Sequence, residues 1–482
     1  MFDTVLVANR GEIALRIIRT CRDLGIRTIA VHSSEDGRAP FALLADHAVE
    51  IGPAPAAQSY LVIDRIIRVA HETGAQAIHP GYGFLSENQH LARSCAETGL
   101  VFIGPTAEAM AAMGDKISAR RRMAASGVPV IQGTEALDAL EDAVEAATRI
   151  GYPVLIKASA GGGGIGMRMA ADEAGLRASF EPAQSTAERA FGDGRLFLER
   201  FVTDARHVEI QVLADAHGNV IHVGERECSI QRRFQKVIEE SPSPALDDRT
   251  RDSMGQAAVR AARAIRYLNA GTVEFVFGGG EFFFLEMNTR LQVEHPVTEL
   301  ISGLDLVAEQ LRIAAGEPLR IEQAEVRLRG HAIECRVYAE DPSRGFVPSP
   351  GRVTGYREPA GPGVRVDGAL NGPGTVSASY DPMIAKVITW GSTREMAVAR
   401  MRRSLLEYAI VGIVTNITFL LAILDDAAFA EGDYSTRFLD DRPELVEAAA
   451  AWDERRRPLL RGVADPSHIA AIAATLAVAG NA

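Results

Sequence analysis

The sequence predicts an α/β protein of several domains that begins with a Rossmann-like parallel sheet. A strand-like apolar run at residues 4–8 leads into a stretch with helical spacing that stops at Gly25, and a second apolar run follows at residues 28–31. Further along, glycine-rich turns separate segments in which polar and apolar residues alternate. The 482 residues correspond to roughly three domains, and 47% of them are hydrophobic, which is ample for packed cores.

The first domain is predicted to span residues 1–114. Its first helix would bury side chains that recur at helical spacing, which are Ile13, Ile17, Cys21 and Leu24. Gly81-Tyr82-Gly83 lacks the third glycine of a dinucleotide-binding fingerprint, and the chain contains no Gly-x-x-x-x-Gly-Lys-Ser/Thr motif. A P-loop enzyme and a typical dinucleotide site are therefore excluded.

Lysine is scarce in this chain. Of its 51 basic side chains, 47 are arginine, and the lysines are Lys116, Lys157, Lys236 and Lys386. Lysine is a compact point charge, whereas arginine is a wide planar fork, so a lysine is needed where one ammonium must fit between phosphate oxygens. The alternative is that four lysines survived by chance in an arginine-rich composition.

A glycine-rich loop follows Lys157. This lysine ends the apolar run 152–156, and glycines follow at 161–164 and 166. Such a loop presents several backbone N–H groups and one ammonium to a polyphosphate. We predict a mobile lid at about 133–202, inside a second domain that spans 115–316. A flexible linker is the alternative, and the strand-like residues after the loop argue against it.

A second polar cluster lies on two strand-like segments, 272–277 and 281–290, that are joined by three glycines. The period of a strand puts Glu286 and Asn288 on one face, and in-register pairing brings Glu274 opposite or diagonal to them. Two carboxylates and an amide oxygen suit Mg²⁺, which proteins hold together with substrate phosphates. The alternative for a single strand glutamate is an exposed edge, but apolar residues occupy the other face here.

If the extended trace continues beyond Asn288, Arg290, Gln292 and Glu294 lie on the same side as this cluster. An arginine, an amide and a carboxylate beside a metal-phosphate site can bind a small oxyanion and remove a proton from it. Glu294 is in phase with the site, so we expect His295 to be structural.

Upstream, residues 206–213 alternate between polar and apolar side chains. His207, Glu209 and Gln211 share one face, so this strand is predicted to line a polar cleft and to pack a core with its other side. The segment 225–236 carries so many charged and amide groups that it forms either a buried site or a solvated loop. Taken alone, it is predicted as a solvated loop.

A third domain is predicted at 330–440, where strands and turns alternate before a helix at 395–408. The alanine-rich region within 441–482 is expected to be a helical tail, which packs on a partner chain or begins a missing continuation.

Composition excludes several classes of protein. The net charge of −12 argues against a general nucleic-acid binder. The four cysteines have no metal-ligand spacing, which is consistent with a reducing compartment and predicts a cytoplasmic protein. The first strand leaves no room for a signal peptide, and the longest apolar stretch is too short to span a membrane.

Several strings occur in a fixed order: Val7-Ala-Asn-Arg-Gly-Glu-Ile-Ala14, His79-Pro-Gly-Tyr-Gly-Phe-Leu-Ser-Glu-Asn88, Lys157 with its glycine loop, Cys228 to Lys236, and Glu286-Met-Asn-Thr-Arg-Leu-Gln-Val-Glu-His-Pro-Val-Thr298. Together they resemble the biotin carboxylases, which are ATP-grasp enzymes, from about residue 2 to about residue 439. Residues 380–386 and 415–417 resemble the alpha chains of acyl-CoA carboxylases. The resemblance implies a Rossmann-like N-terminal sheet, an ATP-grasp domain with a mobile glycine-rich lid, and a C-terminal α+β biotin carboxylase domain.

The resemblance also implies a set of site residues. ATP would be bound by Lys116, Lys157, Gly163, Gly164, Glu199, Val202, His207, Gln231 and Glu274. Two Mg²⁺ or Mn²⁺ ions would be held by Glu274, Glu286 and Asn288. Bicarbonate would be bound by Lys236, Arg290, Gln292 and Val293. Glu294 would be the general base, Arg336 would stabilise the biotin enolate, and Tyr82 and Gly83 would lie near the biotin ring.

The implied reaction is the ATP-dependent carboxylation of biotin, the first half-reaction of an acyl-CoA carboxylase. Deprotonated bicarbonate would attack the γ-phosphate to give carboxyphosphate, which breaks down to CO₂ and phosphate. The phosphate would take the ureido proton of biotin, and the enolate would capture CO₂. The chain has no Met-Lys-Met sequence and no lysine after Lys386. Biotin would therefore sit on a separate carrier protein or domain, and a carboxyltransferase subunit and a homodimer are also implied.

Two residues depart from the family pattern. Ile165 stands in the glycine loop where many members carry a basic residue, and Phe234 stands where His or Asn is frequent. Two other classes of protein share part of this pattern. Another ATP-grasp carboxylate–amine ligase would share the nucleotide and metal residues, but not the string from Arg290 to Glu294 or Arg336. A non-catalytic ATP-binding subunit would not need an intact set of acidic residues.

Overall fold

The computed structural model describes residues 1–159 and 166–464. Within that part of the chain, no helix is both long and apolar enough to cross a membrane. Gly163, Gly164 and Ile165 lie outside the described residues, as does the end of the tail.

The N-terminal region is a five-stranded parallel sheet with the strand order β3-β2-β1-β4-β5. Its elements are β1 (Thr4–Val7), α1 (Gly11–Asp23), β2 (Arg27–His32), α2 (Pro40–Leu44), β3 (His47–Glu50), η1 (Ala56–Gln58), α3 (Ile63–Glu72), β4 (Ala77–His79), α4 (Gln89–Glu97) and β5 (Val101–Phe102). Val5 and Leu6 belong to different hydrophobic clusters, so both faces of the sheet are covered. The predicted strand–helix–strand unit is confirmed.

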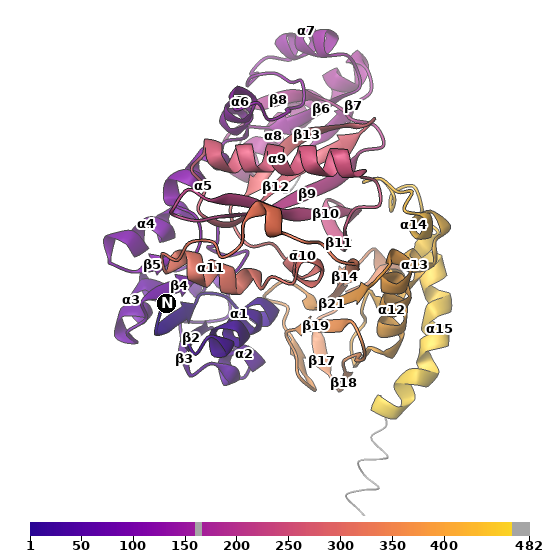
Figure 1. Cartoon of the computed structure of the whole chain (residues 1–482). Helices are drawn as coiled ribbons and strands as arrows, with labels where there is room; N and C mark the ends of the chain where they lie inside the picture. Colours follow the sequence, from indigo (N-terminus) through magenta and orange to yellow (C-terminus); the bar gives the residue numbers. More distant parts are fainter. Residues whose placement is uncertain (160–165, 465–482) are drawn as a thin grey trace, which may run out of the picture.

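An eight-stranded antiparallel sheet forms the centre of the molecule (Figure 1), in the order β13-β12-β9-β10-β11-β14-β21-β19. Its strands are β9 (Arg206–Ala214), β10 (Val220–Arg232), β11 (Gln235–Ser241), β12 (Asn269–Gly278), β13 (Glu281–Asn288), β14 (His331–Tyr338), β19 (Val364–Gly368) and β21 (Met383–Gly391). The pairing of β11 with β14 makes the sheet continuous across the predicted second and third domains.

Helices cover both sides of this sheet. α9 (Asp248–Ala264) packs on β9 and β12 through a core that includes Met254 and Phe275. α10 (His295–Ser302) and α11 (Leu306–Ala314) lie on the other side, where Leu311 and Val307 share a hydrophobic cluster with α1. This cluster joins the N-terminal sheet to the central one.

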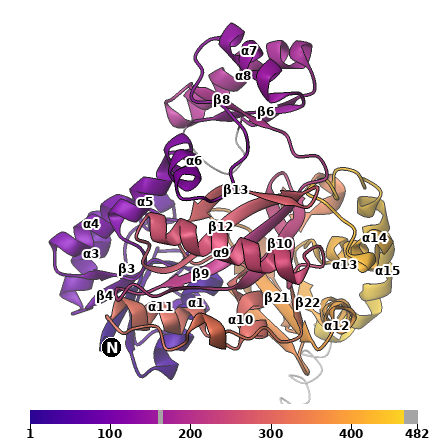
Figure 2. The ribbon, with the colours of Figure 1, turned by 45° about the horizontal axis from the view of Figure 1, so that its top comes forward.

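A small unit stands above the central sheet (Figure 2). Its elements are α7 (Leu140–Ile150), β6 (Val154–Ala158), β7 (Arg168–Ala170), α8 (Glu173–Phe191) and β8 (Leu196–Arg200), and α5 (Ala107–Gly114) and α6 (Lys116–Ala125) precede it. Its strands pair in the order β7-β6-β8. Phe180, Leu176 and Ile156 are among the residues of a core that belongs to this unit alone. The elements from α7 to β8 lie within residues 133–202, for which a lid is predicted.

The C-terminal region packs on the free face of β14 and β21. Its remaining elements are η2 (Gln323–Glu325), β15 (Glu340–Asp341), η3 (Pro342–Arg344), β16 (Val347–Pro348), β17 (Gly351–Val353), β18 (Gly355–Arg357), β20 (Gly374–Val376), α12 (Arg394–Glu407), β22 (Ala409–Val411), α13 (Ile417–Asp425), α14 (Ala427–Glu431) and α15 (Leu445–Ala464). Val387 of β21 and Met401 of α12 share one core with Leu445 and Ala449 of α15. The first part of the expected tail is therefore a helix that packs on its own chain.

Candidate active site

A cavity of about 1100 Å³ lies between the central sheet and the lid unit. Most of the predicted site residues line it: Lys116, Lys157, Glu199, Val202, His207, Gln231, Lys236, Glu274, Glu286, Asn288, Arg290, Gln292, Val293, Glu294 and Arg336. These residues come from segments that are up to 220 positions apart in the chain, and the fold brings them to one surface.

Glu274 is the centre of the predicted metal cluster. It is the cross-strand partner of Glu286, as the hairpin pattern predicts. Its carboxylate accepts hydrogen bonds from Asn288 Nδ2 at 2.7 Å and from Gln292 Nε2 at 2.7 Å. Burial alone would raise the pKa of Glu274, but Lys236 and His207 outweigh it and lower the pKa to about 2. Glu274 is therefore ionised at neutral pH.

These residues fit a divalent cation. Glu274 and Glu286 supply carboxylate oxygens and Asn288 supplies an amide oxygen, which are the ligands that Mg²⁺ prefers. His207 Nε2 lies 3.1 Å from Glu274 Oε2; burial lowers the pKa of His207, but Glu274 and Glu209 together outweigh it and raise the pKa to about 9. The protonated side chain of His207 is thus a cation that lies beside the carboxylates of the cluster.

Lys236 joins three carboxylates at the floor of the cavity. Its Nζ lies 2.5 Å from Glu209, 2.6 Å from Glu294 and 3.1 Å from Glu274. Burial would lower the pKa of this lysine, but the three carboxylates raise it well above its ordinary value. The ammonium is therefore charged throughout the neutral range.

The turn after β13 differs from the extended trace that the sequence predicted. β13 ends at Asn288, and Glu294 is the N-cap residue of α10, with Pro296 in the first turn of the helix. The prediction of a continuous strand to Glu294 is wrong, because a helix that starts here forces the chain to turn. Arg290, Gln292 and Glu294 still reach the cavity, but through this turn.

Arg336 contacts the second carboxylate oxygen of Glu294. Its Nη2 donates to Glu294 Oε2 at 3.0 Å, and its Nε donates to Glu239 Oε1 at 2.6 Å. Glu294 therefore lies between the ammonium of Lys236 and the guanidinium of Arg336. Arg290 donates to Asn288 Oδ1 at 2.9 Å, and it pairs with Glu87 at 3.1 Å.

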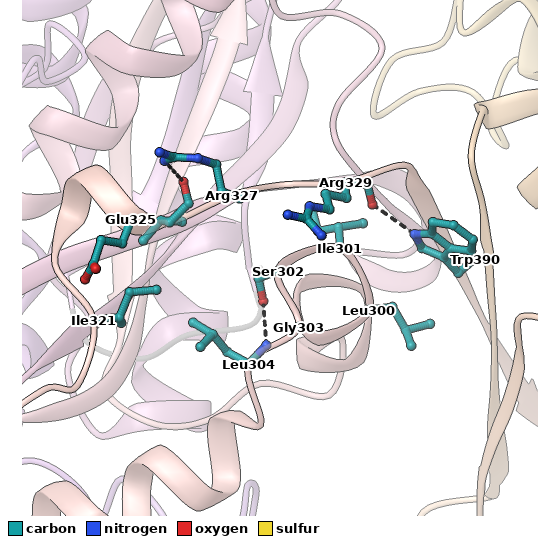
Figure 3. Close-up of a pocket in the computed structure, with 11 residues that line it drawn as sticks. Leu300, Ile301, Ser302, Gly303, Leu304, Ile321, Glu325, Arg327, Arg329 and Trp390 are labelled. Atoms are coloured by element: carbon teal, nitrogen blue, oxygen red, sulfur yellow. Dashed lines mark hydrogen bonds between the residues drawn. The ribbon is translucent and has the colours of Figure 1, made fainter.

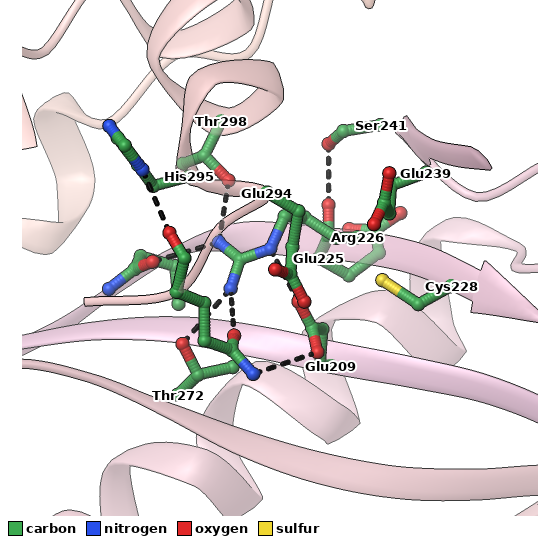
Figure 4. A network of polar contacts seen from close by, with 12 residues as sticks. Glu209, Glu225, Arg226, Cys228, Glu239, Ser241, Thr272, Glu294, His295 and Thr298 are labelled. Atoms are coloured by element: carbon green, nitrogen blue, oxygen red, sulfur yellow. Dashed lines mark hydrogen bonds and ion pairs between the residues drawn. The ribbon is translucent and has the colours of Figure 1, made fainter. Parts of the chain in front are cut away.

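Sequence reasoning missed Arg226, which is buried beneath the cavity (Figure 4). Its guanidinium donates to Glu209, Gln211, Thr272, Thr298 and Gln292, so that all five N–H donors are used. The prediction of a solvated loop at 225–236 is wrong. Residues 225–231 form a buried part of β10, because their charged side chains find partners there, and only Arg233 and Phe234 form an exposed turn before β11. The alternation in residues 206–213 was the signal that such partners existed.

At the lid, Lys157 of β6 donates to Glu199 of β8 at 2.7 Å, and both residues face the cavity. Lys116 lies 3.3 Å from Glu286 at the outer end of the carboxylate cluster. Gln231 donates its side-chain amide to the carbonyl of Cys228 at 2.7 Å. Two of the predicted ammonium groups thus stand at the lid side of the cavity, and Lys236 stands at its floor.

Comparisons with known proteins agree with this geometry. Residues 1–110 match the family model "Biotin carboxylase, N-terminal domain", residues 115–322 match "Carbamoyl-phosphate synthase L chain, ATP binding domain", and residues 334–441 match "Biotin carboxylase C-terminal domain". The chain belongs to the biotin carboxylase family.

Individual members of the family are similar over most of their length. The biotin carboxylase of Nostoc sp. is 52% identical over 91% of this chain and 99% of its own. The propionyl-CoA carboxylase alpha chain of Ruegeria pomeroyi is 51% identical over 93% of this chain and 69% of its own. The biotin carboxylase domain of the Hydrogenobacter thermophilus 2-oxoglutarate carboxylase, solved as a dimer with MgADP, ADP and bicarbonate, is 48% identical over 92% of this chain and 99% of that one, with a TM-score of 0.89.

Two residues predicted for this biotin carboxylase site do not line the cavity. Tyr82 and Gly83 lie in the loop after β4, where the carbonyl of Tyr82 accepts a hydrogen bond from Asn9 at 2.8 Å. Phe234 does line the cavity, and its side chain is 59% exposed in the left-handed turn between β10 and β11. It offers an aromatic face where the family often has a polar side chain.

A smaller cavity of about 410 Å³ lies beside α10 and away from these residues (Figure 3). Leu300, Leu304 and Trp390 give it apolar walls, and Arg327 and Arg329 lie at its rim. Trp390 Nε1 donates to the carbonyl of Arg329 at 2.9 Å. No residue of the predicted site lines this cavity.

Proposed function

We propose that the chain carries out the ATP-dependent carboxylation of biotin with bicarbonate, through carboxyphosphate. The observation that carries this proposal is the position of Glu294, with one carboxylate oxygen 2.6 Å from Lys236 and the other 3.0 Å from Arg336. A base held between two cations, next to an ionised carboxylate cluster, is suited to deprotonate a bound oxyanion.

Each part of the cavity has a role in this proposal. Lys236, Arg290, Gln292 and the backbone of Val293 bind bicarbonate, and Glu294 accepts its proton. Glu274, Glu286 and Asn288 would hold a divalent cation, which would supply charge neutralisation for the phosphates of ATP. Arg336 offers its guanidinium to the enolate oxygen of biotin, and Tyr82 and Gly83 stay proposed neighbours of the biotin ring although neither lines the cavity. The nucleotide is held by the remaining predicted residues, which are Lys116, Lys157, Gly163, Gly164, Glu199, Val202, His207 and Gln231.

The predicted division of the chain belongs to the same proposal. Residues 1–114 and 330–440 would flank an ATP-grasp domain at 115–316 with its lid at 133–202, and the segment 441–482 would be a tail. The separate hydrophobic core of the lid supports this division.

The proposed partners are a biotin carrier protein or domain, a carboxyltransferase subunit and a second copy of the chain. Members of the family occur in carboxylases with different acceptors, and we propose an acyl-CoA as the final acceptor from the resemblance at residues 380–386. All four cysteines are free, which supports a reducing compartment such as the cytoplasm.

The test is an assay of ATP hydrolysis by the purified chain. We expect hydrolysis that depends on bicarbonate and that free biotin stimulates. Turnover of ATP with neither dependence would contradict the proposal. A different carboxylate–amine ligase would instead require an amine acceptor, and a non-catalytic subunit would bind ATP without hydrolysis.

A further inference from the structure

Lys386 is fully buried in β21, and the motifs of the sequence leave its role open. Its Nζ donates to the backbone carbonyl of Val293 at 2.9 Å, and it lies 3.2 Å from Glu12 Oε1 and 3.8 Å from Asp367 Oδ2. These groups belong to the turn after β13, to α1 and to β19. One ammonium therefore joins three separate parts of the fold.

The register of the sheet links this lysine to Arg336. Lys386 on β21 is the cross-strand partner of Arg336 on β14, so both side chains leave the sheet on the same face. Arg336 holds the carboxylate of Glu294, and Lys386 holds the carbonyl of Val293, the residue just before it. Two neighbouring cations thus hold two consecutive residues of one turn.

A simpler explanation is that Lys386 only neutralises Glu12. The hydrogen bonds argue against this. Neither carboxylate oxygen of Glu12 accepts a hydrogen bond from any residue that the structure describes, whereas the Val293 carbonyl does accept one from Lys386. Burial also raises the pKa of Glu12 to about 7, against the opposing effect of Lys386. The shortest polar contact of this ammonium is therefore with the turn, at 2.9 Å to the Val293 carbonyl against 3.2 Å to Glu12.

A lysine suits this position for steric reasons. The ammonium is enclosed on all sides, with the ring centre of Tyr82 5.8 Å away and Glu12 and Asp367 close by. The planar fork of an arginine is wider than the compact ammonium of a lysine. This accounts for a lysine here in a chain that is otherwise rich in arginine.

We propose that Lys386 is a positioning residue for the reaction. Its hydrogen bond to the Val293 carbonyl fixes the turn that carries Gln292, Val293 and Glu294, and so fixes the bicarbonate-binding groups and the base relative to Arg336. The proposal rests on the proposed function of that turn. It predicts that loss of the ammonium harms the use of bicarbonate and leaves the use of ATP nearly unchanged.

The test compares two variants. Lys386→Met/Glu12→Leu removes the ammonium together with the carboxylate that would otherwise be left unpaired, since a buried ion pair can often be replaced by apolar side chains without loss of stability. Glu12→Gln is the matched control, because it removes the ion pair and keeps the hydrogen bond to Val293. Initial rates of ATP cleavage are measured against bicarbonate and against ATP, and thermal unfolding is measured in parallel.

We expect the double variant to lose about tenfold to a hundredfold in kcat/KM for bicarbonate, which is the size of one charge-assisted hydrogen bond. Its KM for ATP should stay within about twofold of the wild-type value, and Glu12→Gln should keep both parameters, because neither change reaches the nucleotide. A double variant with an unchanged kcat/KM for bicarbonate would overturn the positioning role. So would an equal loss in Glu12→Gln, because the ion pair would then be the cause.

Assays of the wild-type chain distinguish a failure of this proposal from a failure of the function on which it rests. If the wild type shows no bicarbonate dependence, the proposed function fails before any variant is compared. If the double variant does not fold, Lys386→Gln replaces it, because its shorter amide fills part of the space without reaching Val293. The same loss for bicarbonate is expected there, and an unchanged value overturns the proposal.

Discussion

Lys236 and Lys386 belong to the same sheet and both contact the turn after β13, but Lys236 is partly exposed and Lys386 is fully buried. Lys236 lines the large cavity, where the nearby carboxylates have several cations and amides as partners. The pKa of Glu274 falls to about 2 there. Lys386 lies in an enclosed layer, where burial raises the pKa of Glu12 to about 7 and that of Glu334 well above its ordinary value.

The difference shows that burial alone does not decide the charge of these acids. Both groups of carboxylates are buried, and both lie near a lysine. The pKa values of Glu209 and Glu274 at the cavity are lowered because each carboxylate has more than one donor, whereas both oxygens of Glu334 lack a hydrogen-bond partner among the described residues. The large cavity is therefore suited to charged substrates, whereas the enclosed layer around Lys386 supports the turn after β13.

The largest effect is expected for a substitution of Glu294, which lines the large cavity. Glu294→Gln should lower turnover at least about a hundredfold, because a general base typically contributes that much. Nucleotide affinity, measured by calorimetry, should change little, since Glu294 contacts Lys236 and Arg336 rather than the lid residues. Wild-type turnover in this variant would remove Glu294 from the mechanism.

Glu240 lies away from both regions. It shows how much a buried and fully paired carboxylate contributes to the free energy of unfolding. Burial would raise its pKa, but His331 and Arg394 lower it from 4.5 to about 2. Glu240→Gln should therefore reduce the free energy of unfolding by about 3 kcal/mol at pH 7.

The contribution of Glu240 to the free energy of unfolding is expected to depend on pH. Because the folded-state pKa lies below the ordinary one, the stabilisation is present above pH 4.5 and is lost as the pH falls toward about 2. Denaturant titrations of the wild type and the variant should converge over that range. A difference that is independent of pH would mean that lost packing, and not charge, causes the effect.

Arg336 lies between the two regions, and Arg336→Lys tests its own role. A lysine keeps the charge but not the two directed bonds to Glu239 and Glu294. We expect carboxylation of free biotin to fall about tenfold more than bicarbonate-dependent ATP cleavage, in line with the loss of one charge-assisted bond. Equal losses in the two assays would assign Arg336 to bicarbonate activation instead.

The smallest effect is expected at Glu334. Burial raises the pKa of this acid well above its ordinary value, which favours its neutral form, and a neutral glutamic acid closely resembles glutamine. Glu334→Gln should change the free energy of unfolding by less than about 1 kcal/mol, because no paired charge is lost. A destabilisation as large as that of Glu240→Gln would show that Glu334 is ionised.

Much of the fold could be predicted from local patterns. The spacing of Ile13, Ile17 and Cys21 predicted α1, and the alternation in residues 206–213 predicted β9. The hairpin that opposes Glu274 and Glu286 followed from two alternating segments joined by glycines. Such patterns are local because they depend on the period of a helix or strand, which is visible within one short segment of the sequence.

Only the tertiary structure decided the remainder. The charged segment 225–231 is buried, and its Arg226 finds partners on β9, β12, α10 and the turn, all distant in sequence. The turn at 289–294 depends on the start of α10, and the role of Lys386 depends on a carbonyl 93 positions away. Sequence by itself determined which residue types were available for the chemistry. Their pairing and their charge were decided by long-range contacts, because the cost of burying a charge depends on the partners that the whole fold supplies.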